Sequence, residues 1–112
     1  LQALVTMNDP VYVEAAQSLA RIMIKSASSL EKQISNGFKI CLSREPQKPE
    51  LDRLLALFHQ VKKRYLNDGG LATKMATDPI GPAPKDFNVV DLAALTVTGN
   101  VLLNLDEMMM KR

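Results

Sequence analysis

The segment that begins at Asn88 restricts the fold more than any other part of the sequence. Apolar side chains recur there every three or four residues, the rhythm of an α-helix. Its main apolar row is Val90, Ala94, Val97, Val101, Leu105 and Met108, and its apolar arc is widened by Ala93, Leu102 and Met109. A helix that is apolar over much of its circumference needs neighbours on several sides. We therefore expect this last helix to lie at the centre of a helical bundle.

The first of the surrounding helices is predicted to begin at Pro10 and to run to about Ser26. Asn8 and Asp9 precede it, supplying a side-chain acceptor for an N-cap, and a proline is well suited to the first helical position. Its apolar face is Tyr12, Ala16, Leu19, Ala20 and Met23.

The second helix is predicted from a capping box in which Ser28 and Glu31 satisfy each other's backbone donors. It should end near Ser43, ahead of Pro46. Its inner face is Leu30, Ile34, Phe38, Cys41 and Leu42. Gly37 lies within this pattern at a cost of about 1 kcal/mol relative to alanine, and our hypothesis is that it allows another helix to approach closely.

The third helix is predicted to start at Pro49, and residues 67–70 should end it with a left-handed C-cap. Its apolar stripe is Leu51, Leu54, Leu55, Phe58, Val61 and Tyr65. Residues 71–75 could form a short helical turn, and residues 78–86 hold three prolines and a glycine, which indicates an irregular loop. Strand signals are nearly absent, so the predicted fold class is all-α: a bundle of four main helices plus a short helical turn.

Length and charge narrow the classes of protein further. A chain of 112 residues fits one domain with one core. The net charge of +2 is too small, and its basic residues too scattered, to indicate nucleic-acid binding. The cluster Lys62, Lys63 and Arg64 is interpreted as a solvated helix end. No apolar run approaches the roughly 18–20 residues of a membrane span. Because the chain opens on Leu1 without an initiator Met, we expect it to be a fragment of a larger protein.

The sequence predicts no catalytic residue, no metal ligand and no cofactor-binding residue. His59, the single histidine, has no His, Cys or acid three or four positions further on. Cys41 lies on an apolar helix face, where a thiol is inert. The three methionines from Met108 to Met110 point in different directions on a helix and cannot converge on one ion.

Five polar residues are candidates for structural or interaction roles: Asn8, Asp9, Asn100, Asn104 and Glu107. Asn100 and Asn104 are four residues apart on a helix that should be mostly buried, and buried amides need partners. We expect them to bond a backbone group of a neighbouring helix or loop and so fix the packing register; ligand binding is the alternative. Asn8 and Asp9 could cap a helix or bind a partner.

Three segments of the chain, in order, resemble a known family. Leu1-Gln2-Ala3-Leu4 followed by Met7-Asn8-Asp9-Pro10 resembles an LQAL…LNDP opening. Residues 38–51, with Phe38, Arg44 and Pro49-Glu50-Leu51, resemble an FRLALGRxPTPEEL segment, and residues 101–107 resemble a closing VLLNLNEF. Together they are similar to the C-terminal domain of unknown function (family 1553 type) of large secreted bacterial proteins best known from planctomycetes.

Departures from the family pattern are Ser43 in place of glycine, Lys48 in place of a capping threonine, and Met108 in place of phenylalanine. The first requires a turn to close without the residue that most easily adopts a left-handed conformation. The second removes a helix cap worth about 1 kcal/mol.

The resemblance implies an extracytoplasmic protein, exported by a signal outside this segment. Many family members carry a cytochrome c domain upstream, which implies haem c in the full-length parent. The chain itself has no Cys-x-x-Cys-His attachment motif.

Three functions remain open at this point. The first is a non-catalytic accessory domain that packs on an upstream domain or a partner protein. The second is one wall of an active site in a parent enzyme acting on polysaccharide or in redox chemistry, with Asn8, Asp9, Asn104 and Glu107 gathered at a cleft. The third is a module whose apolar groove binds a peptide or helix.

Overall fold

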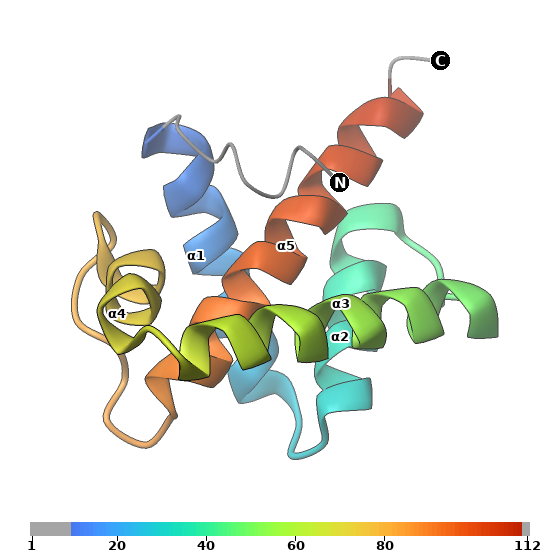
Figure 1. Ribbon diagram of the computed structural model, residues 1–112. Coiled ribbons are helices and arrows are strands. Elements are labelled where there is room, and N and C mark those ends of the chain that lie inside the picture. Colours follow the sequence, from blue (N-terminus) through green and yellow to red (C-terminus); the bar gives the residue numbers. More distant parts are fainter. Residues whose placement is uncertain (1–9, 111–112) are drawn as a thin grey trace.

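The computed structural model describes the backbone of residues 10–110 and the side chains of residues 13–105. Within that part the chain forms five helices and no strand, which confirms the all-α prediction. The helices are α1 (Pro10–Ser26), α2 (Leu30–Leu42), α3 (Lys48–Leu66), α4 (Gly69–Thr77) and α5 (Val89–Met110), shown in Figure 1. No helix in the described residues combines the length and hydropathy that a membrane span requires.

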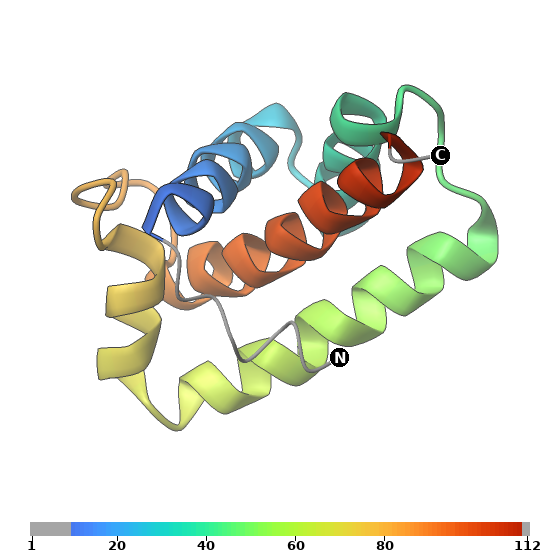
Figure 2. The same ribbon diagram turned by 90° about the horizontal axis from the view of Figure 1, so that it is seen from above.

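The last helix is central, as predicted. Figure 2 shows α5 running between α1 on one side and α3 on the other, with α4 lying across one end. Every residue from Leu92 to Asn100 is buried, so α5 is enclosed on all sides over more than two turns. The side chains of residues 106–110 at the end of α5 are outside the described set.

The crossing of α1 and α5 is close because small residues line it. A Cβ atom on Gly99 would lie 3.3 Å from the carbonyl oxygen of Ala16 and 3.4 Å from Cδ2 of Leu19. Ala16 and Ala20 are fully buried on the α1 side. A larger residue at position 99 would push the two helices apart.

The remaining helices complete one core. Its buried members include Leu19, Met23, Ile34, Phe38, Leu54, Phe58, Leu92, Leu95 and Leu102. The predicted apolar faces of α1, α2 and α3 thus point inward, with Leu30, Cys41, Leu42, Leu51, Leu55, Val61 and Tyr65 half-buried at the edge of the core. Tyr12 lies outside the described side chains.

Gly37 allows the close helix approach that the sequence suggested. A Cβ atom at this position would lie 2.6–2.9 Å from three side-chain atoms of Met23, which is fully buried on α1. The prediction that Ser28 caps α2 was wrong by one residue. Ser29 is the N-cap, and its hydroxyl accepts a hydrogen bond from the N–H of Lys32.

The turn between α2 and α3 closes on Ser43, which has a left-handed φ of 59°. This is the conformation expected at a position where the family pattern has glycine. The third helix starts at Lys48, one residue before the predicted Pro49. Its N-cap is Gln47, whose N–H donates to the Glu50 side chain at 2.8 Å. Lys48 therefore does not occupy the capping position that the family pattern suggested.

Residues 67–70 do not form the predicted left-handed cap. Asn67 ends α3 in a right-handed conformation, and Asp68 caps a new helix by accepting a hydrogen bond from the N–H of Leu71. This cap draws Gly69 and Gly70 into the first turn of α4. The predicted helical turn over 71–75 is consequently a nine-residue helix.

The loop predicted over residues 78–86 extends over residues 78–88 and contains a cis Asp78–Pro79 peptide bond and Gly81 at a positive φ of 120°. The loop ends where Asn88 caps α5. Its side-chain oxygen accepts from the N–H groups of Val90 and Asp91 at 2.8 and 3.1 Å.

The contact between Gly37 and Met23 predicts a strong coupling. We expect Gly37→Ala to lower the free energy of unfolding by about 1–3 kcal/mol, because the new methyl group overlaps a packed side chain. In a Met23→Ala background the same change should cost much less, because the overlapping atoms are gone. Denaturant unfolding of the four proteins in this double-mutant cycle measures the coupling. Additive effects would contradict the contact.

Candidate functional site

Of the five residues predicted for structural or interaction roles, the structure describes the side chains of two, Asn100 and Asn104. Asn8 and Asp9 lie outside the described residues, and so does the side chain of Glu107. Asn100 is 2% exposed, deep in α5. Asn104, one turn further on, is half-buried and has an interaction partner.

The expected backbone hydrogen bond of Asn100 is not made through its side-chain oxygen within the described residues. Its Oδ1 atom is buried and has no hydrogen-bond partner among the described residues. A buried, unpaired polar atom costs roughly 1–3 kcal/mol, so this amide does not stabilise the packing register in the way predicted.

The amide that does join two elements is Gln17 on α1, which is fully buried. Its Nε2 donates to the carbonyl oxygens of Met75 and Asp78 at 2.7 and 2.8 Å. Its Oε1 accepts from the N–H of Ile80 at 3.3 Å. One side chain therefore satisfies three backbone groups where α4 passes into the following loop.

Arg21, one turn along α1 from Gln17, binds the same region. Its Nη2 donates to the carbonyl oxygens of Ala76 and Gly81 at 3.2 and 2.6 Å. A cation at the end of α4 also complements the partial negative charge of the last helical carbonyls. Its Nε is buried and has no hydrogen-bond partner among the described residues. We call Gln17 and Arg21 together the latch.

The sequence held a signal for the latch that the prediction missed. Gln17 stands in a row with Val13, Ala20 and Ile24, all of which are buried at helical spacing. A lone amide in such a row needs backbone partners, and Arg21 follows it at the spacing of one turn. The partners themselves, at residues 75–81, could not be identified from the sequence.

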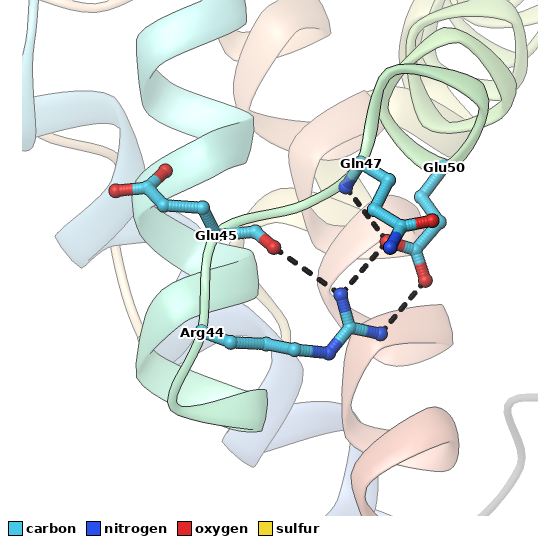
Figure 3. Close-up of polar contacts among 4 residues, drawn as sticks. All are labelled: Arg44, Glu45, Gln47 and Glu50. Atoms are coloured by element: carbon cyan, nitrogen blue, oxygen red, sulfur yellow. Dashed lines mark hydrogen bonds and ion pairs between the residues drawn. The ribbon is translucent and has the colours of Figure 1, made fainter.

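A second polar cluster holds the turn between α2 and α3 (Figure 3). Nη1 and Nη2 of Arg44 donate to Oε1 and Oε2 of Glu50 at 2.9 and 2.8 Å, a bidentate pair. Nη1 also donates to the carbonyl oxygen of Glu45 at 3.2 Å. The guanidinium carbon lies 4.9 Å from the ring centroid of Phe38, a cation–π distance.

This arrangement changes the acidity of both partners. The Arg44 guanidinium, together with the N–H of Gln47, lowers the pKa of the Glu50 carboxyl from 4.5 to about 2. The same hydrogen bond raises the pKa of Arg44. Glu50 is therefore ionised at neutral pH, and its carboxylate stabilises the turn by accepting the hydrogen bonds of Arg44.

An ion pair joins α3 to the first turn of α5. Nζ of Lys62 lies 2.9 Å from Oδ1 of Asp91, in an ion pair without hydrogen-bond geometry. Lys62 had been interpreted as part of a solvated helix end with Lys63 and Arg64. Only the latter two are exposed.

The described residues hold no group of three or more His, Cys, Asp or Glu side chains arranged to bind a metal ion. His59 is exposed and packs edge-to-face on Phe58, with ring centroids 5.5 Å apart. Cys41 is half-buried at the edge of the core.

Comparison with known proteins identifies the family. The sequence model of PSD1, described as a protein of unknown function (DUF1553), matches residues 1–58, more than half of the 112-residue chain. The chain belongs to this family. No curated protein and no solved structure matches it.

The DUF1553 match covers α1, α2 and the first half of α3. It therefore includes Gln17 and Arg21, and also Arg44 and Glu50. The segment of the sequence that resembles the family from Phe38 to Leu51 now has a physical explanation: it builds the Arg44–Glu50 turn over the Phe38 ring. The backbone groups that accept from the latch lie beyond the match.

The two buried amides predict opposite mutational effects. Gln17→Met keeps the side-chain length but leaves three backbone groups unpaired, so we expect the free energy of unfolding to fall by about 2 kcal/mol or more. Asn100→Leu keeps the branched shape and removes an unpaired oxygen, so we expect a change within about 1 kcal/mol, or an increase. Urea unfolding measures both. Equal losses would contradict the assigned hydrogen bonds.

The lowered pKa of Glu50 predicts a pH-dependent contribution to stability. The ionised form is favoured in the folded state, so the stabilisation is complete above the unfolded pKa of about 4.5 and is lost as the pH falls toward about 2. Thermal unfolding of the wild type and Glu50→Gln should show a Tm gap that is largest at neutral pH and closes over that window.

The matched control is Asp52→Asn, which removes a carboxylate that pairs with the exposed Lys48 at 3.3 Å. Its effect on Tm at neutral pH should be smaller, since exposed pairs of this kind contribute little. A Tm gap between wild type and Glu50→Gln that stays constant down to pH 2 would exclude an ionised Glu50 as the group that stabilises the turn.

Proposed function

We propose that this DUF1553 chain is a non-catalytic helical accessory domain that packs on an upstream domain of the same polypeptide or on a partner protein. The observation that supports the proposal is that both polar clusters form their hydrogen bonds with other groups of the same domain. The latch donates to the chain's own backbone, and the bidentate face of Arg44 is occupied by Glu50. These groups serve the architecture and are not available to a substrate.

The contact surface that we assign to this function is the corner where α3 passes into α4. Leu66 at the end of α3 is 65% exposed, and Leu71 in the first turns of α4 is 54% exposed. Two large apolar side chains at one corner provide an anchor that can be buried against another protein. Ile22 and Ile40 are also exposed but lie on separate helices, α1 and α2.

Location and cofactor follow from the family resemblance and belong to the same proposal. The domain functions outside the cytoplasm, and any haem c in a longer parent belongs to a separate upstream domain. The single cysteine of this chain supports that division, since covalent attachment of haem c through Cys-x-x-Cys-His needs two.

The alternative, a wall of an active site, depends on Asn8, Asp9, Asn104 and Glu107 meeting at a cleft. The structure describes the side chain of only one of them, Asn104, and places it half-buried on α5. We favour the accessory function because the latch and the Arg44–Glu50 pair are engaged within the domain itself.

A binding experiment with charge substitutions at the corner tests the proposal. Leu66→Lys with Leu71→Glu should weaken association with the upstream portion of the parent protein by about tenfold or more, as measured by calorimetry. Both charges suit the helix ends where they stand, so the fold should be retained. Circular dichroism checks this.

The matched control is Gln60→Lys with Thr73→Glu, which places the same charges on the same two helices at exposed polar positions. It should bind like the wild type. Failure of the wild-type domain to associate, or equal weakening by both pairs of substitutions, would reject the proposed surface.

A further inference from the structure

The segment between α3 and α5, residues 67–88, buries few large apolar side chains and is held to α1 by side-chain hydrogen bonds. The only side chains that α4 buries fully are those of Ala72 and Ala76, which contribute little apolar area. Met75 and Phe87 are half-buried against the core. Most apolar stabilisation of the domain therefore comes from the other four helices.

The latch supplies what apolar burial does not. Five hydrogen bonds join Gln17 and Arg21 to this segment: four are donated to the carbonyl oxygens of Met75, Ala76, Asp78 and Gly81, and one is accepted from the N–H of Ile80. Each of these hydrogen bonds joins residues more than fifty positions apart in the sequence. They are concentrated where α4 ends and the loop begins.

The start of the same segment is built to bend. Gly69 and Gly70 both stand in the first turn of α4, yet a Cβ atom on Gly69 would meet nothing within 4 Å. On Gly70 it would meet only Oδ1 of Asp68, at an ordinary 3.6 Å. Since neither space nor a positive φ requires glycine here, the pair weakens the helix without a packing benefit. A helix of nine residues is also marginal by itself.

The closed latch carries an electrostatic cost. Arg21 is partly buried, its described partners are neutral carbonyls, and its Nε atom is buried without a hydrogen-bond partner among the described residues. Opening returns this cation to water, and the hydration gained offsets part of the hydrogen bonding lost. The closed and open states are thereby brought nearer in free energy.

We propose that residues 67–88 form a strap that opens as a unit at the Gly69–Gly70 hinge while the other helices stay folded, and that Gln17 and Arg21 are its latch. Opening uncovers the part of α5 against which α4 packs. The latch therefore controls how often apolar surface of the central helix meets solvent.

Native-state hydrogen exchange of the full chain tests the strap. In the wild type, amides of residues 72–78 should exchange faster, and with a weaker dependence on denaturant, than amides of residues 92–102. Identical rates and denaturant dependence for the two sets would overturn the proposal, and this measurement needs no variant.

Two glutamine variants separate strap opening from global unfolding. Gln17→Met should speed exchange of both amide sets by the same factor, about tenfold or more, because the latch is broken in both openings. The matched control is Gln33→Met, since Nε2 of Gln33 donates to the carbonyls of Ile24 in the last turn of α1 and of Ala27 in the connection to α2. It should speed exchange of residues 92–102 alone, because that connection stays closed when the strap opens.

A control variant that speeds both sets equally would show that the strap and the core unfold together. A Gln17→Met variant that leaves residues 72–78 unchanged would show that the latch does not hold the strap. Either result contradicts the proposal.

Discussion

Enclosure of α5 is the constraint on which the rest of the structure depends. Its buried stretch from Leu92 to Asn100 leaves no face for water, so neighbours are required all around it. On one side, the glycine at position 99 brings α1 to within contact distance of the α5 backbone. α3 lies on the opposite side, and α4 closes the remaining end (Figure 2). The connections between the outer helices must therefore pass around this buried central helix.

The polar residues of the domain act at these connections. Helix ends leave carbonyl groups without intrahelical partners. Gln17 and Arg21 donate to such groups at the end of α4, and Arg44 donates to Glu45 between α2 and α3. The difference between the two clusters is burial. Gln17 is enclosed and its hydrogen bonds are partly buried, whereas the Arg44–Glu50 pair stays accessible to solvent.

The fold was predictable from the sequence because apolar spacing determines which face of each helix points inward. The central position of the last helix followed from its broad apolar arc. Helix ends were less predictable: Ser28 and Ser29 are chemically identical caps, and Asp68 could cap a new helix or belong to the end of the preceding one, just before two glycines. The sequence analysis expected buried amides to bond backbone groups of another element and named Asn100 and Asn104, but it did not name Gln17, whose amide makes three such bonds. The partners of Gln17 lie on a distant segment that passes beside α1, and the spacing of residues within one helix does not predict where that segment runs.

The residues that match the family model do not include all the helices that form the core. Residues 1–58 include the latch donors and the Arg44–Glu50 turn but neither α4 nor α5. The inward faces of α1 and α2 have no α5 to enclose in that segment alone, and Gln17 has none of the three backbone groups that satisfy its amide. That segment alone therefore leaves apolar side chains exposed to water and lacks the hydrogen bonds of Gln17. The unit that folds must therefore extend through α5, and the exposed corner at Leu66 and Leu71 belongs to that larger unit, beyond the matched segment.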